Sequence, residues 1–432
     1  MRRLSTHLML GLGLLATTQL VACGEGDATE PSPNADGHVT LQSSLSRDEN
    51  PSVSNEDFSA LIAGNHSFAL ELYQGLEKAS GNTLISPLSI RTAFGLLHAG
   101  AAGSTESDIE TGLHFNLRGE AVYPAMNKLG LELEARNWPG DDETDPVELY
   151  IANTFWGQQG YAWKETYLDR IALHYGAGIE TLDFASQPDE SRVIINDYVE
   201  DFTRERIKDL LPMGSIRPDT VAVLTNALYF KAPWETPFEE WATQDASFTN
   251  LDGSTADVEM MAQLEYVGYY EDEQVKAVEL DYANRELSML LILPNADTFA
   301  AFESSMTTDD IDTIVGALSP AMGDVQIPKF TFESAFKLKD PLTNMGLSSI
   351  FASADLSEMI DNGNLLVDEV YHKTFIAVDE KGTEAAAATA IVVGETSMPM
   401  SQFEFRADRP FLMAIRDKIT GNFLFFGRVS EL

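Results

Sequence analysis

A run of small residues with a period of two, from Gly382 to Gly394, constrains this chain more than any other feature. Glu384 carries the only charge inside the run and falls in one parity. The other parity is small or apolar throughout: Thr383, Ala385, Ala387, Thr389, Ile391 and Val393. Because side chains of a strand alternate between its faces, the run can bury one face and expose the other. It can therefore be an exposed loop or a buried strand; an Ala-rich surface helix or linker is the alternative.

The flanking segments carry a resemblance to a known family. The run follows 370–379 and precedes 405–415 and 421–429. This ordered set resembles the C-terminal signature of the serpins. In that comparison the hinge of the reactive-centre loop corresponds to Glu380, Gly382, Thr383, Glu384, Ala385, Ala386, Ala387, Ala388 and Thr389. The match is long and ordered, which makes it more specific than a short motif.

Two further segments extend the resemblance. Residues 82–90 read as a strand entering a helix, where Ser86 can cap the helix and Pro87 suits its first turn. Residues 220–231 are nearly continuously apolar, so both faces of that strand should be covered. Asn226 inside this run needs hydrogen-bond partners if it is buried. Between these two segments we expect a helix that begins near Asn196 and ends near Leu211.

The resemblance implies both a fold and a region where its main sheet opens. The fold is α+β, with three β-sheets, about nine helices and an exposed reactive-centre loop, in one domain spanning 57–432. The sheet-opening region would contain Ser86, Ser89, Asn226, Trp234 and His372, with His372 as the partner of Asn226.

The implied function is inhibition of serine-type endopeptidases by a suicide-substrate mechanism. The protease attacks the loop and forms an acyl-enzyme, and the cut loop then inserts into the main sheet before hydrolysis finishes. Small, uncharged residues in the inward parity of the hinge suit this insertion. A noninhibitory serpin that acts as carrier, chaperone or storage protein is the alternative, and a hydrolase has no motif in its favour.

The family's spacing from Gly382 places the reactive bond between Thr396 and Ser397. Thr396 suits an elastase-like or subtilisin-like protease, whereas Glu395 keeps a glutamate-specific protease open. No Lys or Arg lies between Lys381 and Arg406, which argues against trypsin-like targets. A cysteine protease stays open as a further covalent partner.

The N-terminus predicts export. Residues 1–22 have a basic start and an apolar run too short to span a bilayer, as in a signal peptide. Cys23, the only cysteine, closes a segment that resembles a bacterial lipobox, so we expect a lipid anchor there; a plain signal peptide is the alternative. Residues 23–56 are polar and predicted to be a disordered tether. The expected location is the outer membrane or cell surface, with release to the extracellular space open.

Composition excludes several partners. The formal net charge is −40, from 68 acidic and 28 basic residues, and no basic cluster interrupts it. Such a surface repels nucleic acid and argues against a heparin-type cofactor; salt adaptation and ordinary solubility both explain the acidity. The seven histidines are not spaced for a metal site, and neither a nucleophile elbow nor a phosphate loop is present. We expect a monomer that is not an enzyme and needs no cofactor.

Overall fold

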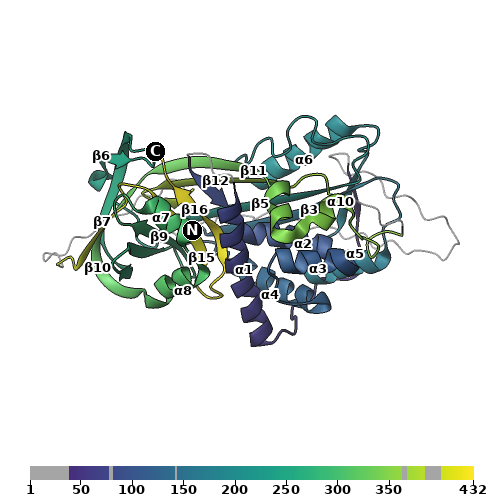
Figure 1. Ribbon diagram of the computed structural model, residues 1–432, viewed down its shortest axis with the longest axis horizontal. Helices are drawn as coiled ribbons and strands as arrows, with labels where there is room; N and C mark the ends of the chain where they lie inside the picture. Colours follow the sequence, from purple (N-terminus) through teal and green to yellow (C-terminus); the bar gives the residue numbers. More distant parts are fainter. Residues whose placement is uncertain (1–37, 77–80, 142–143, 362–366, 385–399) are drawn as a thin grey trace, which may run out of the picture. The chain divides into compact units, whose positions relative to one another are not determined.

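Two hydrogen-bonded sheets organise the part of the chain that this computed structural model describes, residues 38–76, 81–141, 144–361, 367–384 and 400–432. All of these residues belong to one compact unit, Pro33–Leu432. The first sheet has seven strands in the order β1-β4-β3-β5-β13-β12-β11. Figure 1 labels β3, β5, β11 and β12 of this sheet. Their bounds are β1 Val39–Leu41, β3 Glu148–Gln158, β4 Ile179–Leu182, β5 Ala222–Pro233, β11 Phe330–Lys337, β12 Tyr371–Asp379 and β13 Gly382–Thr383.

The second sheet has nine strands in the order β14-β10-β7-β8-β9-β15-β16-β2, with β6 paired to β7. Their bounds are β2 Thr83–Ile85, β6 Gln244–Thr249, β7 Thr255–Glu271, β8 Val275–Asp281, β9 Leu287–Pro294, β10 Ser319–Pro328, β14 Phe403–Arg406, β15 Phe411–Asp417 and β16 Phe423–Val429. The 17-residue β7 pairs with β6 through its first residues and with β8 through its last. Two of the three expected sheets are therefore joined into one hydrogen-bonded sheet through this long strand.

Helices surround the two sheets, so the expected α+β class is confirmed. Among the described residues the α-helical segments are α1 Asn55–Gly75, α2 Pro87–His98, α3 Gly103–Gly112, α4 Val122–Glu134, α5 Glu165–Tyr175, α6 Pro188–Phe202, α7 Phe299–Ser305, α8 Thr308–Ala317, α9 Lys339–Leu342 and α10 Ser348–Ala352. Short helical turns occur at Gly119–Ala121, Glu240–Ala242 and Thr343–Leu347.

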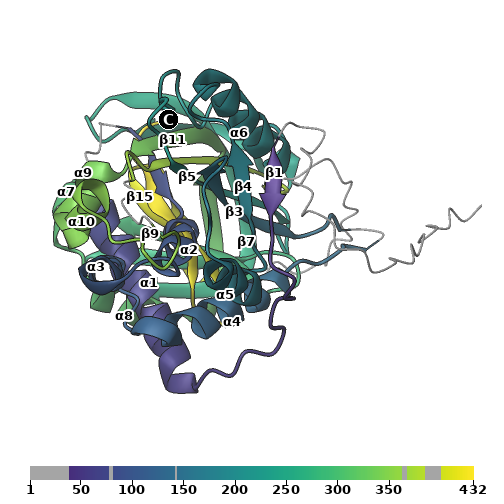
Figure 2. The same cartoon turned by 90° about the vertical axis from the view of Figure 1, so that its right-hand side faces the viewer.

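The first sheet is covered on both faces, as the apolar run at 220–231 predicts. Figure 2 shows β3 and β5 between α6 on one face and α2 on the other. Ile195 and Val199 of α6 pack with Trp156 of β3 and Ala227 of β5 in one buried cluster. The main core lies on the opposite face, where α2 packs between the two sheets.

Helix α6 differs from the expected helix near 196–211. It begins at Pro188, which suits a first turn, and ends at Phe202. Arg204 and Glu205 both have positive φ angles, which an α-helix does not tolerate. The Asn196 side chain does not start the helix, because it is committed to two hydrogen bonds with the backbone of Leu211.

The folded part begins earlier than the boundary expected at Asp57. Strand β1 pairs antiparallel with β4, and the backbone N–H of Asp48 donates to Leu173. The Arg47 side chain donates to Asn127 and pairs with Glu134 of α4. Residues 38–56 therefore pack on the domain, although we expected them to be tether. Composition missed this because polar and backbone groups make most of these contacts, and Leu41 and Val53 are among the few apolar side chains of the segment that pack on the core.

Candidate functional site

The hinge of the resemblance lies inside the first sheet. Strand β13 consists of Gly382 and Thr383 and is seated between β5 and β12. Thr383 pairs with Ala232 of β5 on one side and with Val378 of β12 on the other. In the described strand order, β5 and β12 are linked through β13 alone. The first residues of the run thus already lie between β5 and β12, where the whole run is expected to insert.

Gly382 is required here by space. Its φ angle is +156°, and a Cβ atom on it would meet the carbonyl oxygen of Ala232 at 2.2 Å. A distance that short excludes any side chain unless the backbone of β5 moves. The sequence suggested a glycine at the hinge. The structure shows why a glycine is needed: the backbone of β5 approaches too closely to leave room for a side chain.

Thr383 contacts a stacked pair of aromatic residues, Tyr282 and Trp234, through a hydrogen bond to Tyr282. Its side chain is buried, and its hydroxyl lies 2.6 Å from the hydroxyl of Tyr282. The Tyr282 ring stacks on Trp234 with centroids 4.7 Å apart, and the Trp234 indole N–H donates to the carbonyl of Asp379 at 3.0 Å. Trp234, predicted in the sheet-opening region, therefore contacts the chain just before the hinge.

The two glutamates of the hinge form ion pairs with basic residues of the surrounding chain. Glu384 forms an ion pair with Arg206 in the segment after α6, with 2.5 Å between Oε1 and Nε, and its backbone N–H donates to Ala377. Burial raises the pKa of Glu384, and the ion pair with Arg206 opposes this only in part. Glu380 accepts a hydrogen bond from Thr243 and lies 3.3 Å from the Lys329 ammonium.

A second group of predicted residues lies further down the same strands. The Asn226 side chain of β5 hydrogen-bonds Ser89 of α2 and also Asn153, its cross-strand neighbour in β3. Ser89 and Asn226 are buried and Asn153 is partly buried, so the apolar strand β5 contains a satisfied polar group, as the sequence required.

His372 of β12 forms its own contact beside this group. Its Nε2 accepts the backbone N–H of Ser86 at 3.0 Å, which requires an unprotonated nitrogen. Complete burial lowers the pKa of His372 to about 3, so the ring is neutral at physiological pH.

Two detailed expectations for this region are wrong. Ser86 precedes α2 but makes no side-chain cap, because its hydroxyl donates to the carbonyl of Leu424 instead. The hydrogen bonds of Asn226 go to Ser89 and Asn153, not to His372. Both errors have one cause, which is that the actual partners lie far away in the sequence, in β16, β3 and α2.

Several predicted residues lie outside the described residues: Cys23, Ala385, Ala386, Ala387, Ala388, Thr389, Thr396 and Ser397. Conversely, sequence reasoning missed Tyr282, Arg206 and Asn153. Nothing in the local sequence marks Tyr282 or Arg206. The one signal at Asn153 is its place in the same alternating parity as Leu149, Ile151 and Phe155.

One possible metal cluster was also missed. Ligand atoms of His98, Glu106 and Glu110 all lie within 4.8 Å of one another. However, Glu110 is already neutralised by Arg118 at 2.8 Å, and Nδ1 of His98 lacks the acceptor that normally orients a metal-binding histidine. We assign no metal to it.

Comparison with known proteins decides the family. The family model for "Serpin (serine protease inhibitor)" matches residues 63–432. This protein belongs to the serpin family. Human Serpin B4 is 36% identical to it over 394 residues, covering 86% of this serpin and 99% of the relative.

Solved structures agree with the family assignment. The thermophilic serpin tengpin in its native state has a TM-score of 0.78 at 28% identity, covering 91% of this chain and 98% of tengpin. Human thyroxine-binding globulin in complex with thyroxine has a TM-score of 0.76 at 26% identity, covering 87% and 99%. The expected serpin fold is thus confirmed. In the described part of this serpin, no helix combines the length and apolarity needed to cross a bilayer.

Proposed function

We propose that this serpin inhibits serine-type endopeptidases as a suicide substrate. The observation that carries the proposal is the position of Gly382 and Thr383, paired on both sides between β5 and β12. A strand that continues from them would complete the first sheet. The gain in backbone pairing and burial would drive the cut loop into the sheet.

The register of β13 indicates how the inserted loop would align. Continuing the same pairing places Ala385 opposite Phe230 and Ile376, and Ala387 opposite Leu228 and Thr374. It places Thr389 opposite Asn226 and His372. All six of these partners are buried, so the loop residues on this face must be small and uncharged, which they are. Glu384 falls on the opposite face, where Arg206 meets it.

The chemistry follows from a substrate that is never released. The protease serine attacks the carbonyl carbon of Thr396, the Thr396–Ser397 amide bond breaks, and Ser397 leaves with a new amino group. Thr396 stays bound to the protease as an ester. Insertion then carries the acyl-enzyme away from its productive geometry before water cleaves the ester. This requires an uncut state that is kinetically trapped.

The side chain at Thr396 favours elastase-like or subtilisin-like targets. Glu395 makes a glutamate-specific protease the first alternative, and a cysteine protease would form the corresponding thioester.

Denaturing gels test the proposal. The mature chain is mixed with elastase, subtilisin and a glutamate-specific protease. We expect a detergent-stable band near the summed mass, and a released peptide whose first residue is Ser397. Complete cleavage without such a band for every serine and cysteine protease tried would reject the mechanism.

A carrier role is the second candidate. Thyroxine-binding globulin, whose structure contains bound thyroxine, is similar to this serpin over most of both chains. A noninhibitory member would be cut in the loop without trapping the protease. Heating the cut form then shows whether insertion occurs, since insertion raises the melting temperature.

For location we propose a lipid anchor at Cys23, carried by the lipobox-like sequence before it. Labelled fatty acid should be incorporated into the chain expressed in a bacterium and not into the Cys23→Ala variant. Equal labelling of the two would exclude the anchor.

A further inference from the structure

Two arginines, Arg406 and Arg409, line a surface cleft that the proposed inhibition does not use. The cleft has a volume of about 790 Å³ and lies where three segments meet: the turn from β6 to β7, the residues that follow β9, and the segment between β14 and β15. This volume falls in the range of about 300–1,000 Å³ that is typical of small-molecule sites. The cleft can therefore accommodate a small organic ligand.

Both arginines keep one end of the guanidinium group unused. Nε of Arg406 lies 3.4 Å from the Asp408 carboxylate, and its Nη1 donates to Gln326 at 2.8 Å. Arg409 donates from Nε to the carbonyl of Pro294 and from Nη1 to Asp408, both at 3.1 Å. Within the described residues, neither Nη2 has a protein partner. The two Nη2 groups are therefore available to a ligand.

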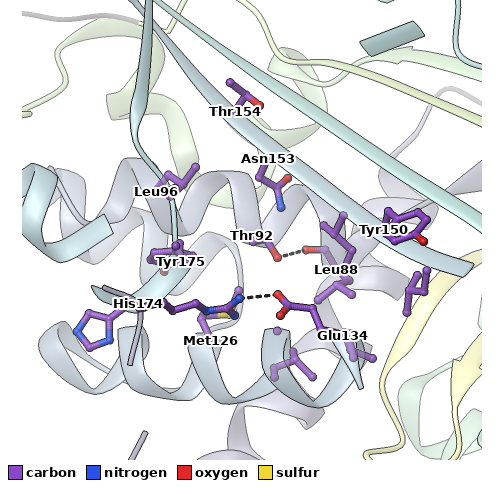
Figure 3. Close-up of a pocket in the computed structure, with 18 of the residues that line it drawn as sticks. Leu88, Thr92, Leu96, Met126, Glu134, Tyr150, Asn153, Thr154, His174 and Tyr175 are labelled. Atoms are coloured by element: carbon purple, nitrogen blue, oxygen red, sulfur yellow. Dashed lines mark hydrogen bonds and ion pairs between the residues drawn. The ribbon is translucent and has the colours of Figure 1, made fainter. Parts of the chain in front are cut away.

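The cavity drawn in Figure 3, beside β3, has the opposite property. All three guanidinium nitrogens of its Arg47 are engaged: Nε with the Asn127 side chain, Nη1 with Glu134 and Nη2 with the Asn127 carbonyl. The dashed line at Glu134 marks this ion pair. An anion would have to displace a protein partner there, whereas the cleft at Arg406 and Arg409 offers donors that are already free.

The charge of the cleft favours a monoanion. Asp408 is the counter-ion of both guanidinium groups, so one positive charge is left over. Asp297 is the other charged residue of the lining, and it is exposed, so water and salt screen its charge. The planar guanidinium group matches a carboxylate in shape and in hydrogen-bonding geometry. A polyanion, in contrast, would meet the repulsion of a chain with a formal net charge of −40.

Uncharged groups form the rest of the cleft. Ser247 and Thr249 lie two residues apart in β6, so their side chains share one face, and both are exposed in the lining. Leu251, Phe299 and Pro410 supply apolar surface on the other sides. An apolar wall with a few polar groups that fix orientation is typical of ligand sites. The expected ligand therefore has an apolar body and one anionic group.

The walls of the cleft are joined to one another by hydrogen bonds. The backbone N–H of Thr249 donates to the carbonyl of Asp408 at 2.8 Å, which joins β6 to the segment of the two arginines. The bond from Arg409 to Pro294 joins that segment to the end of β9. Because the walls are held in place before a ligand arrives, binding costs little ordering.

We propose that this cleft binds a small organic carboxylate with an apolar body, and that the free Nη2 groups of Arg406 and Arg409 donate to its carboxylate. The apolar wall receives the rest of the ligand. Binding here requires neither a protease nor insertion of the loop, so the site stands or falls separately from the proposed function.

Fluorescence titration tests the site without any protease. The probe is dansylglycine, a carboxylate with an aromatic body, and its matched control is dansylamide, which has the same aromatic body without the charge. We expect saturable enhancement at one site, with dansylamide binding at least tenfold more weakly, and an affinity for dansylglycine that falls as salt is raised. Absence of saturable binding, or equal affinity for the two probes, would overturn the assignment.

Arginine variants test the two donors. Arg406→Gln and Arg409→Gln should each weaken dansylglycine binding about three- to tenfold and leave dansylamide binding unchanged. Arg285→Gln is the charge-matched control, because Arg285 is exposed, pairs with Glu235 and lies outside the lining of the cleft. It should bind dansylglycine as the parent does. Parent-level affinity in both folded variants at Arg406 and Arg409 would reject the site.

A pair of variants on α7 locates the probe even if an arginine variant fails to fold. Ala300 and Ala301 are neighbouring exposed residues of this helix, and of the two only Ala300 lines the cleft. Ala300→Trp should weaken dansylglycine binding at least tenfold, whereas Ala301→Trp should leave it unchanged. The same affinity in both variants would place the probe elsewhere and contradict the proposal.

Two competitors distinguish the sources of the carboxylate. Octanoate represents a free fatty acid, and N-acetyl-leucyl-phenylalanine represents the C-terminus of an apolar peptide. We expect dansylglycine to be displaced, and the competitor that acts at the lower concentration identifies the source. Failure of both competitors to displace the probe would reject a carboxylate as the ligand.

Discussion

The hydroxyl groups of Tyr282 and Thr383 lie 2.6 Å apart in a buried contact between the body of the serpin and its hinge. Tyr282 follows β8 in the second sheet's part of the chain, whereas Thr383 lies in the first sheet. The contact is supported by the stacking of Tyr282 on Trp234. The hinge is therefore held in the sheet by a specific hydrogen bond, in addition to having side chains small enough to fit there.

A double-mutant cycle measures this contact. Tyr282→Phe and Thr383→Val each remove one hydroxyl while nearly preserving volume. We expect a coupling free energy of about 1 kcal/mol between them, from the urea dependence of the first unfolding transition. Strictly additive effects would show that the two hydroxyls do not stabilise one another in solution.

Thr383→Arg should convert the inhibitor into a substrate. The side chain at this position is 3% exposed and lies between Ala232 and Val378, so a guanidinium buried there costs several kcal/mol. We therefore expect the variant to expel the hinge from the sheet, which stops insertion at its first residues. Gels should show cleaved serpin and active protease in place of the trapped complex. The matched control is Ala386→Arg, in the opposite parity, which should still trap. A Thr383→Arg variant that traps protease as well as the parent does would contradict the proposed mechanism.

Arg206→Met should loosen the hinge. It leaves the Glu384 carboxylate, whose side chain is 10% exposed, without its guanidinium, and should further raise the pKa of that carboxyl. Because Arg206 is half-exposed, the loss of stability should be modest, about 1 kcal/mol. Limited proteolysis within 385–399 should become faster. Arg204→Met removes the neighbouring cation, which pairs with Glu148 instead, and should leave the cleavage rate of the loop unchanged.

His372 should make stability fall in acid. Burial lowers its pKa to about 3 in the folded chain, against 6.5 as the ordinary value for the unfolded chain. The unfolded state thus binds the proton first, and the free energy of unfolding falls as pH drops from about 6.5 toward about 3. The stability that neutral His372 contributes is fully present above pH 6.5. Below that pH, the free energy of unfolding falls by at most about 1.4 kcal/mol per pH unit.

His372→Gln isolates this effect, because the glutamine oxygen can still accept from Ser86. Urea unfolding of the parent and the variant is compared between pH 5 and 7, with His66→Gln on α1 as the control histidine. The pH slope should be smaller in His372→Gln alone. The same slope in all three proteins would mean that His372 is not held neutral by the fold.

Local sequence patterns predicted helices and strands best where a strand is buried on both faces or where buried and exposed residues alternate strictly. The apolar run at β5 and the sequence of β2 into α2 follow from hydrophobicity, proline position and strand propensity. The start of α6 at Pro188 had a signal too, with Asp189 and Glu190 in its first turn, but the apolar residues further along outweighed it. The packing of residues 38–56 had no comparable signal, since an edge strand of three residues is recognised mainly through its backbone.

The family resemblance, the small uncharged parity of the hinge and the need for partners at Asn226 can all be inferred from the sequence alone. These properties depend on residue types and on spacing along the chain, which are visible without coordinates. Other contacts are visible only in the folded chain: Gly382 faces the carbonyl of Ala232, Thr383 contacts Tyr282, and Ser89 and Asn153 hydrogen-bond Asn226. Each of these contacts joins residues more than 70 positions apart. Strand register sets Gly382 against β5 and Asn153 against Asn226, whereas the packing of α2 and of the second sheet on the first brings Ser89 and Tyr282 into place. Local preference specifies neither.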